Sequence, residues 1–300
     1  MKVKARAALE LMRPANIITA FADILAGFAA AGGVLALTSS GFDLEPDGVG
    51  WLLLATFGLY GGGIVFNDVF DASIDAEERP ERAIPSGRIS GLEASAMGIV
   101  LFLIAGFAAL QVNTLALILT VAIALCTLIY NAWAKHSAVA GPLFMGLCRG
   151  GNFLLGGSLL PSGLAHIWYI ALIPIIYISA ITLISRGEVG GGSRLHGKMA
   201  LYMIVFVLLL IPLFSLFQEF NFLISLPFYL LFAYMVLPPF KKASDSLMAD
   251  DIRKAVKRGV VSLVIFNSVL AAGFAGWTAG VIVLLLFPLS AGVARLFSVT

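Results

Sequence analysis

Long apolar segments, separated by short polar breaks, run along nearly the whole chain. A helix that crosses a bilayer needs about 20 predominantly apolar residues, and nine or ten segments of this sequence reach that length. They are residues 16–37, 49–69, 92–111, 114–133, 139–160, 166–185, 199–218, 221–240, 258–276 and 278–297. Glycines interrupt the last two, so that end fits either two helices or one helix and a re-entrant or interfacial segment. The pattern predicts an all-α, polytopic membrane helical bundle.

The composition excludes a soluble globular domain. Hydrophobic residues make up 60% of the chain and charged residues only 12%, whereas an ordinary soluble domain carries about 25% charged residues. The basic N-terminus leads into a span-length segment rather than a short apolar stretch with a cleavage site. We therefore expect that the first helix is not removed as a signal peptide. The net charge of +2 says nothing about nucleic acid, and no nucleic-acid partner is expected; the distribution of charge along the chain is more informative. Cys126 and Cys148 lie in apolar segments and are expected to be packing residues.

The positive charges predict the orientation. If the N-terminus is cytosolic, 18 of the 19 lysines and arginines fall in cytosolic segments and none in the opposite loops. The remaining cation, Arg149, lies inside an apolar segment. The opposite loop at 38–48 carries Asp43, Glu45 and Asp47 and no cation. We therefore expect an integral, multi-pass protein of a bacterial inner (plasma) membrane, with the N-terminus and residues 67–90 in the cytosol.

Residues 67–90 concentrate the charge of this apolar chain. Three aspartates, three glutamates and three arginines fall within these 24 positions. Asp68, Asp71 and Asp75 stand at i, i+3 and i+7, and Asn67 is four residues before Asp71, so a helix continuing from the apolar segment would align them on one face. Like charges so close together favour a hard divalent cation, and Mg²⁺ takes one or two carboxylates together with phosphate oxygens. Nearby arginines can then neutralise a polyphosphate.

A simpler interpretation is a charged cytosolic loop whose carboxylates and arginines pair with one another. The spacing of the aspartates, the abrupt Pro80 and the turn at residues 85–87 favour the metal site over it.

The segment resembles the first aspartate-rich motif of the UbiA superfamily of membrane-embedded prenyltransferases. The resemblance rests on Asn67-Asp68-x-x-Asp71-x-x-x-Asp75, Arg79-Pro80-x-Arg82 and Ile84-Pro85-Ser86-Gly87-x-Ile89-Ser90. It implies one transmembrane prenyltransferase domain over residues 1–300, with about nine transmembrane helices. It also implies a magnesium-dependent enzyme that transfers the prenyl group of an isoprenoid diphosphate to a small aromatic or lipophilic acceptor within the lipid bilayer.

The resemblance and the charge pattern together suggest roles for individual residues. Metal ligation and catalysis are expected of Asp68, Asp71 and Glu188, with Asp75 as a further ligand. Diphosphate binding is expected of Asn67, Arg82, Arg88, Lys135, Arg149, Asn152, Arg186 and Arg194. Lys135 follows Tyr130, as in a similar family pattern, although aromatic and lysine side chains at a membrane boundary are also interfacial anchors.

Two ionisable residues lie inside apolar segments, where charge is costly unless it faces protein or water. Asp23 is either a buried hydrogen-bonded partner or a group that lines a cavity. Arg149 shares a helix face with Asn152. We interpret Arg149 as lining the active-site cavity, where it contacts diphosphate or a carboxylate such as Asp23; the alternative is a purely structural pair. The segment Arg13-Pro14-x-Asn16 lies at the start of the first apolar segment. Its pattern is typical of a helix start, and the family often has a similar motif there.

The second half of the chain departs from the family pattern. Most members carry a second aspartate pair near the end of the sixth span, whereas here Glu188 is the only acidic residue between Glu93 and Glu219. One carboxylate can complete a single magnesium site, but a full second site is not expected. The glycines at 190–192 instead allow backbone amides to approach phosphate, or form a flexible loop. This segment is similar to the EboC-type branch of UbiA-like proteins.

Two functions remain open at this stage. The first is the intramembrane prenyltransferase. The second is a non-catalytic or transport-type UbiA-like protein that binds a prenyl diphosphate or a lipophilic product. The reduced second motif and the intramembrane Asp23 and Arg149 favour this second function.

Overall fold

The computed structural model describes residues 2–38, 47–216 and 220–293, and every regular element in them is helical. The first half contains α1 Lys2–Met12, α2 Pro14–Ala30, α3 Gly33–Thr38, α4 Gly48–Phe70, α5 Ala72–Glu78, α6 Gly91–Leu110, α7 Thr114–Ala132 and α8 Ala140–Gly157. The second half contains α9 Pro161–Ile167, α10 Leu172–Ser185, α11 Arg194–Leu213, α12 Phe222–Ser246, α13 Ala249–Ala275, α14 Trp277–Leu284 and α15 Leu286–Val293. Short 3₁₀ turns are Ala134–His136, Trp168–Ala171 and Phe214–Leu216. The predicted all-α polytopic bundle is confirmed.

Seven helices of the described residues are long and apolar enough to cross a membrane, and the number rises to eight if α1 and α2, bent by 42°, form one span. The helix α8 has 18 residues but also six glycines, Arg149 and Asn152, which lower its apolar character. The helix α8 is not among these spans, so the expected number of nine stays a prediction. Of the tenth apolar segment, the described residues form the shorter apolar helix Trp277–Val293, and residues 294–297 lie outside the described residues.

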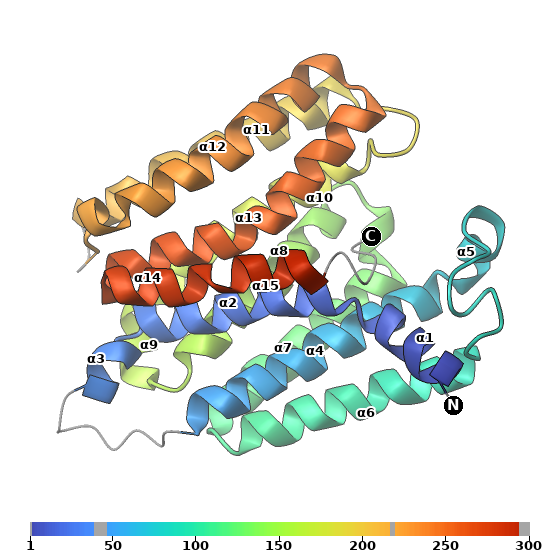
Figure 1. The fold of residues 1–300 in the computed structure, drawn as a ribbon, viewed down its shortest axis with the longest axis horizontal. Coiled ribbons are helices and arrows are strands. Elements are labelled where there is room, and N and C mark those ends of the chain that lie inside the picture. Colours follow the sequence, from blue (N-terminus) through green and yellow to red (C-terminus); the bar gives the residue numbers. More distant parts are fainter. Residues whose placement is uncertain (1, 39–46, 217–219, 294–300) are drawn as a thin grey trace.

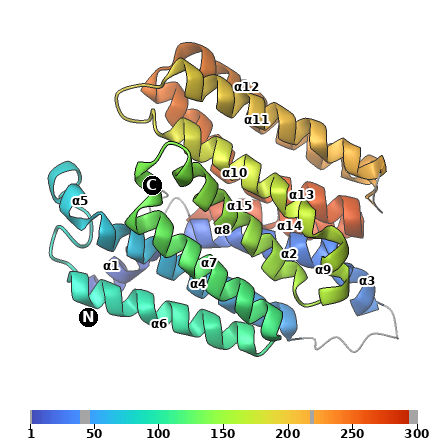
Figure 2. The same cartoon turned by 180° about the vertical axis from the view of Figure 1, so that it is seen from behind.

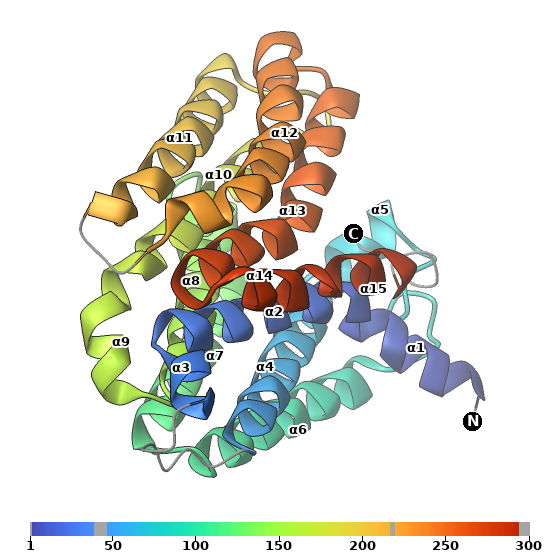
Figure 3. The ribbon, with the colours of Figure 1, turned by 60° about the vertical axis from the view of Figure 1, so that its left-hand side comes forward.

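The helix α2 runs through the middle of the bundle, with α4, α6 and α7 on one side and α10 to α13 on the other (Figure 1). Seen from behind, α7, α8 and α10 form the facing layer (Figure 2). The pair α14–α15 lies along α2 and α13 (Figure 3). Glycines allow α2 and α8 to pack backbone to backbone: a Cβ on Gly27 would lie 1.9 Å from the carbonyl oxygen of Phe153.

The polar loops gather at one end of the bundle. The glycine loop after α10 meets the turn between α12 and α13 through a hydrogen bond from the Gly192 amide to the Leu247 carbonyl, 2.9 Å. Arg186 donates to the backbone carbonyl of Lys135, 3.2 Å, which links the α10 and α7 ends. Several charged residues of the sequence pattern lie outside the described residues, namely Asp43, Glu45, Glu219 and Arg295.

Candidate active site

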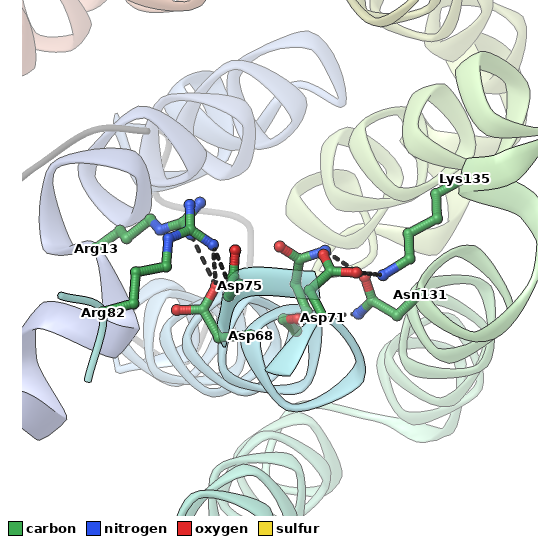
Figure 4. Close-up of polar contacts among 9 residues, drawn as sticks. Arg13, Asp68, Asp71, Asp75, Arg82, Asn131 and Lys135 are labelled. Atoms are coloured by element: carbon green, nitrogen blue, oxygen red, sulfur yellow. Dashed lines mark hydrogen bonds and ion pairs between the residues drawn. The ribbon is translucent and has the colours of Figure 1, made fainter. Parts of the chain in front are cut away.

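The acidic segment begins where α4 ends. The Asp71 amide donates to the Asn67 carbonyl, 3.0 Å, and the Asp75 amide donates to the Asp71 carbonyl, 2.8 Å. The helical hydrogen-bond pattern therefore continues from α4 into α5 through Asp71. Asp68 and Asp75, seven residues apart, point toward Arg13 and Arg82, whereas Asp71 points toward Lys135 (Figure 4). The expected single face holds for Asp68 and Asp75 but not for Asp71.

Two arginines bind the Asp68 and Asp75 side. Arg13, at the bend between α1 and α2, places Nη2 2.8 Å from Asp68 Oδ1. Arg82 reaches back from the following loop, with Nη1 2.7 Å from Asp75 Oδ2 and 3.5 Å from Asp68 Oδ1. Arg82 thus bridges the two aspartates, and both guanidinium groups approach the same oxygen of Asp68, Oδ1 (Figure 4).

A second set of contacts forms on the Asp71 side. Lys135, which follows α7, pairs with Asp71. One turn earlier, Asn67 donates to the side-chain oxygen of Asn131, 3.1 Å, and Asn131 donates to the carbonyl of Gly63, 3.1 Å. These bonds join the ends of α4 and α7 and bring a lysine and two amides to one place.

The donor set fits magnesium in its chemistry. Asp68, Asp71, Asp75 and Asn67 offer hard oxygen ligands within two turns of one helix, as Mg²⁺ requires. Within the described residues, however, no group of three or more Asp, Glu, His or Cys side chains is arranged to hold a metal. Each aspartate is instead paired with an arginine or a lysine, the arrangement that the simpler interpretation predicted.

The other predicted residues lie at different places around this end of the bundle. Arg88 pairs with Glu10 of α1 and donates to the Glu81 carbonyl, 2.8 Å, so it holds the loop to α1. Arg186 donates to the backbone of Lys135 and Ser137. Arg194 is exposed at the start of α11.

Glu188 follows α10, and its backbone carbonyl accepts from Arg253, 3.2 Å. Partial burial raises the pKa of its carboxyl, while the charges of Arg253 and Arg79 lower it. In the part of the chain that the structure describes, the three cations that hold the aspartates, Arg13, Arg82 and Lys135, form no ion pair with Glu188.

A cavity of about 340 Å³ opens beside the acidic segment. Helices α2, α4, α7, α8, α10 and α13 form its wall. At the aspartate end it is lined by Arg13, Asn67, Tyr130 and Asn131, and its middle is apolar, with residues such as Ile64. A ligand with a charged head and an apolar body would match this division.

The inner end of the cavity holds the predicted intramembrane pair. Arg149 Nε lies 3.0 Å from Asp23 Oδ2, and the two side chains are only 2% and 1% exposed. Asn152 donates to the same Asp23 oxygen, 3.1 Å, and Asn267 of α13 donates to the other, 2.7 Å. Arg149 also donates to Thr19, 2.8 Å, and to the hydroxyl of Tyr60. The predicted contact between Arg149 and Asp23 is present, and Arg149 also lines the cavity.

Several of these partners did not emerge from the sequence as site residues. We interpreted Arg13 as part of a helix start, although the similar motif in the family could have indicated a role in the site. Asn131 stands in the segment that contains Lys135 but was not singled out. Tyr60, Thr19 and Asn267 lie in apolar segments, where no local pattern distinguishes a polar cluster member from an ordinary packing residue.

The chain matches the UbiA prenyltransferase family over residues 25–250. The digeranylgeranylglyceryl phosphate synthase of Methanothrix thermoacetophila is 34% identical over 193 residues, which cover 64% of this chain and 67% of that protein. The enzyme of the same name from Methanosarcina mazei is 31% identical over 208 residues, 66% of this chain and 70% of that protein.

Solved structures show the same fold. A structure reported for digeranylgeranylglyceryl phosphate synthase in membranes has a TM-score of 0.68 at 21% identity and covers 91% of this chain and 99% of its own. A UbiA homolog from Archaeoglobus fulgidus bound to GPP and Mg²⁺ has a TM-score of 0.53 at 14% identity, over 96% of this chain and 99% of its own. The family match spans most of the chain, and the protein is therefore a polytopic membrane prenyltransferase of the UbiA prenyltransferase family.

Proposed function

We propose that this protein transfers the prenyl group of an isoprenoid diphosphate to a lipophilic acceptor, with magnesium held at the end of α4. The observation that carries the proposal is the arrangement of three cations, Arg13, Arg82 and Lys135, with three aspartates beside one largely apolar cavity. The Archaeoglobus homolog bound to GPP and Mg²⁺ supports a divalent metal and a prenyl diphosphate as ligands.

The roles of the residues follow from their chemistry. Asp68 and Asp71 would be the first magnesium ligands, with Asp75 and Asn67 as support. When bound, the metal would supply positive charge that stabilises a departing diphosphate. The sequence predicts Glu188 as a ligand from the other half of the bundle, but we leave it out of the proposed site because it pairs with none of the three cations named above.

The cations act by exchanging partners. Arg13, Arg82 and Lys135 now neutralise aspartates, and they would donate to diphosphate oxygens once the aspartates served as metal ligands. The allylic carbon–oxygen bond breaks with its electron pair passing to the diphosphate. The acceptor then bonds to the prenyl carbon, and its proton passes to the departed diphosphate. The apolar wall of the cavity excludes water, so hydrolysis is disfavoured.

The acceptor need not be aromatic. The relatives are named for a glyceryl phosphate product, which supports an aliphatic hydroxyl acceptor as the first to test, with an aromatic ring as the second. The purified protein is incubated with magnesium, a labelled prenyl diphosphate and each acceptor. Acceptor-dependent release of diphosphate is expected. Binding without release under any of these conditions would favour the non-catalytic alternative.

We also propose that the aspartate end faces the cytosol and that residues 1–300 form one domain. The loops at this end hold most of the cations, and α14–α15, beyond the family match, pack on α2 and α13. A single cysteine at position 86 in a cysteine-free background should be inaccessible to an impermeant reagent added outside intact cells. Labelling of this cysteine from outside would contradict the proposed orientation. The relatives reported above are archaeal, and the bacterial membrane stays a prediction.

A further inference from the structure

Two side-chain contacts, one helical turn apart, connect the end of α4 to the end of α7. In the first, Asn67 donates to the side-chain oxygen of Asn131, 3.1 Å. In the second, Lys135 pairs with Asp71. Asn67 and Asp71 are four residues apart, and Asn131 and Lys135 have the same spacing, so the two contacts follow one face of each helix. Figure 4 shows Asn131 and Lys135 together on the Asp71 side.

The backbone of α4 comes close to α7 just before these contacts. A Cβ on Gly63 would lie 2.7 Å from Cγ2 of Thr127, so a larger residue than glycine would push the helices apart. Asn131, one turn after Thr127, therefore reaches the α4 backbone and donates to the Gly63 carbonyl, 3.1 Å. Asn131 is only 2% exposed, so its amide depends on protein partners rather than on bulk water.

The Gly63 carbonyl determines the orientation of both side-chain amides. A carbonyl oxygen can only accept, so Asn131 must turn its nitrogen toward Gly63. The Asn131 oxygen is then left to accept, so Asn67 must turn its nitrogen toward Asn131. Neither bond uses the Asn67 oxygen, and Asn67 lines the cavity beside the aspartates. The two bonds therefore leave this oxygen available to a ligand.

We propose that Asn131 is a positioning residue for magnesium, which holds the Asn67 amide so that its oxygen, and not its nitrogen, is presented to the metal. This inference rests on the proposed function, in which Asn67 supports the aspartates as a ligand. Mg²⁺ binds oxygen, so an Asn67 amide that rotates freely would often present the wrong atom. Loss of a group that orients a metal ligand typically weakens metal binding roughly 10- to 100-fold.

The contact between α4 and α7 does not depend on Asn131 alone. Lys135 still pairs with Asp71 one turn later, and Thr127 still lies against Gly63 one turn earlier. Asn131→Leu keeps the bulk of the side chain and removes both amide bonds. The helices should therefore stay together in this variant, while the Asn67 amide is no longer held.

The test is the magnesium concentration that gives half-maximal binding of geranyl diphosphate to the full-length protein without acceptor, measured by calorimetry. We expect Asn131→Leu and Asn67→Ala each to raise this concentration at least tenfold. The double variant should raise it no further than Asn67→Ala alone, because Asn131 acts through Asn67. Thr127→Ser removes one methyl group from the same helix contact and leaves both amides in place. This matched control should change the concentration less than twofold.

Thermal unfolding shows which variants are folded, and Asn131→Ala replaces Asn131→Leu if the latter does not fold. An unchanged magnesium dependence in a folded Asn131 variant, or in folded Asn67→Ala, would overturn the inference and leave the proposed function standing. A full further loss on adding the Asn131 substitution to Asn67→Ala would also overturn it, because Asn131 would then act on the helix contact rather than through Asn67. Lack of magnesium-dependent binding by the unchanged protein would overturn the proposed function together with the inference.

Discussion

The protein contains two clusters of paired charges that differ in their surroundings. At the aspartate end, Asp71 and Lys135 remain 21% and 13% exposed, and Arg82 remains 17% exposed. At the inner end of the cavity, Asp23 and Arg149 are 1% and 2% exposed. The first cluster is formed by helix ends and a loop, whereas the second is formed by the middles of α2, α8 and α13. Ion pairs of similar chemistry therefore differ in their exposure to water.

The surroundings decide what each cluster can do. An ion pair that water can reach separates at a lower cost than a fully buried pair, because water solvates the separated charges. In a fully buried pair, each charge alone would lack solvation. The aspartate end is therefore suited to exchange carboxylates for a metal and a diphosphate, and the inner cluster is suited to hold three helices in a fixed arrangement.

The largest expected effect is on the inner cluster. Arg149→Met leaves Asp23 without its cation, and breaking a buried pair in this way costs about 3–5 kcal/mol. Thermal unfolding in detergent should show a marked loss of stability or no folded protein. The double variant Asp23→Asn with Arg149→Met removes both charges and should recover part of the loss. A single variant as stable as the unchanged protein would show that the pair is not buried as described.

An intermediate effect is expected for Arg82, which bridges Asp68 and Asp75. Arg82→Gln removes charge-assisted bonds that contribute about 1.5–3 kcal/mol when shielded from water, and partial exposure should bring the loss near the lower end. Magnesium-dependent binding of geranyl diphosphate should weaken at least tenfold in calorimetry. Arg79→Gln, an exposed arginine of the same loop, serves as the matched control and should change stability by no more than about 0.5 kcal/mol. Equal effects in the two variants would show that Arg82 contributes no more to binding than an exposed arginine of the same loop.

The smallest effect is expected for Glu188. If it completed the metal site, Glu188→Gln would impair binding as severely as Asp68→Asn. Because Glu188 pairs with none of Arg13, Arg82 and Lys135, the cations that hold the aspartates, we expect a loss of less than tenfold in magnesium-dependent binding, with folding unaffected. A loss equal to that of Asp68→Asn would show that the two halves of the bundle close around one ligand.

Much of this architecture could be predicted from local pattern. The described part of each apolar segment is mainly helical, since a backbone in lipid must satisfy its own hydrogen bonds. Arg82 and Asp75, seven residues apart, belong to one motif, and Asn152 shares a helix face with Arg149. Within one helix or turn, the period of the backbone determines which side chains meet.

Contacts between distant segments could not be predicted in the same way. Arg13 and Asp68 are 55 residues apart, Lys135 and Asp71 are 64 apart, and Asn267 reaches Asp23 across 244 residues. Such pairs depend on which helices are neighbours, and that depends on close packing at glycines such as Gly27 and Gly156. The orientation of Asp71 away from Asp68 likewise depends on where α7 places Lys135.

The central claim is that the aspartate end, and not the inner cluster, binds the metal and the diphosphate. The most direct measurement is calorimetric titration of geranyl diphosphate with and without magnesium into the unchanged protein, Asp68→Asn and Asp71→Asn, with thermal unfolding to confirm that each variant is folded. The account predicts magnesium-dependent binding in the unchanged protein and at least a hundredfold weaker binding in both folded variants. Unchanged magnesium-dependent binding in both variants would contradict it.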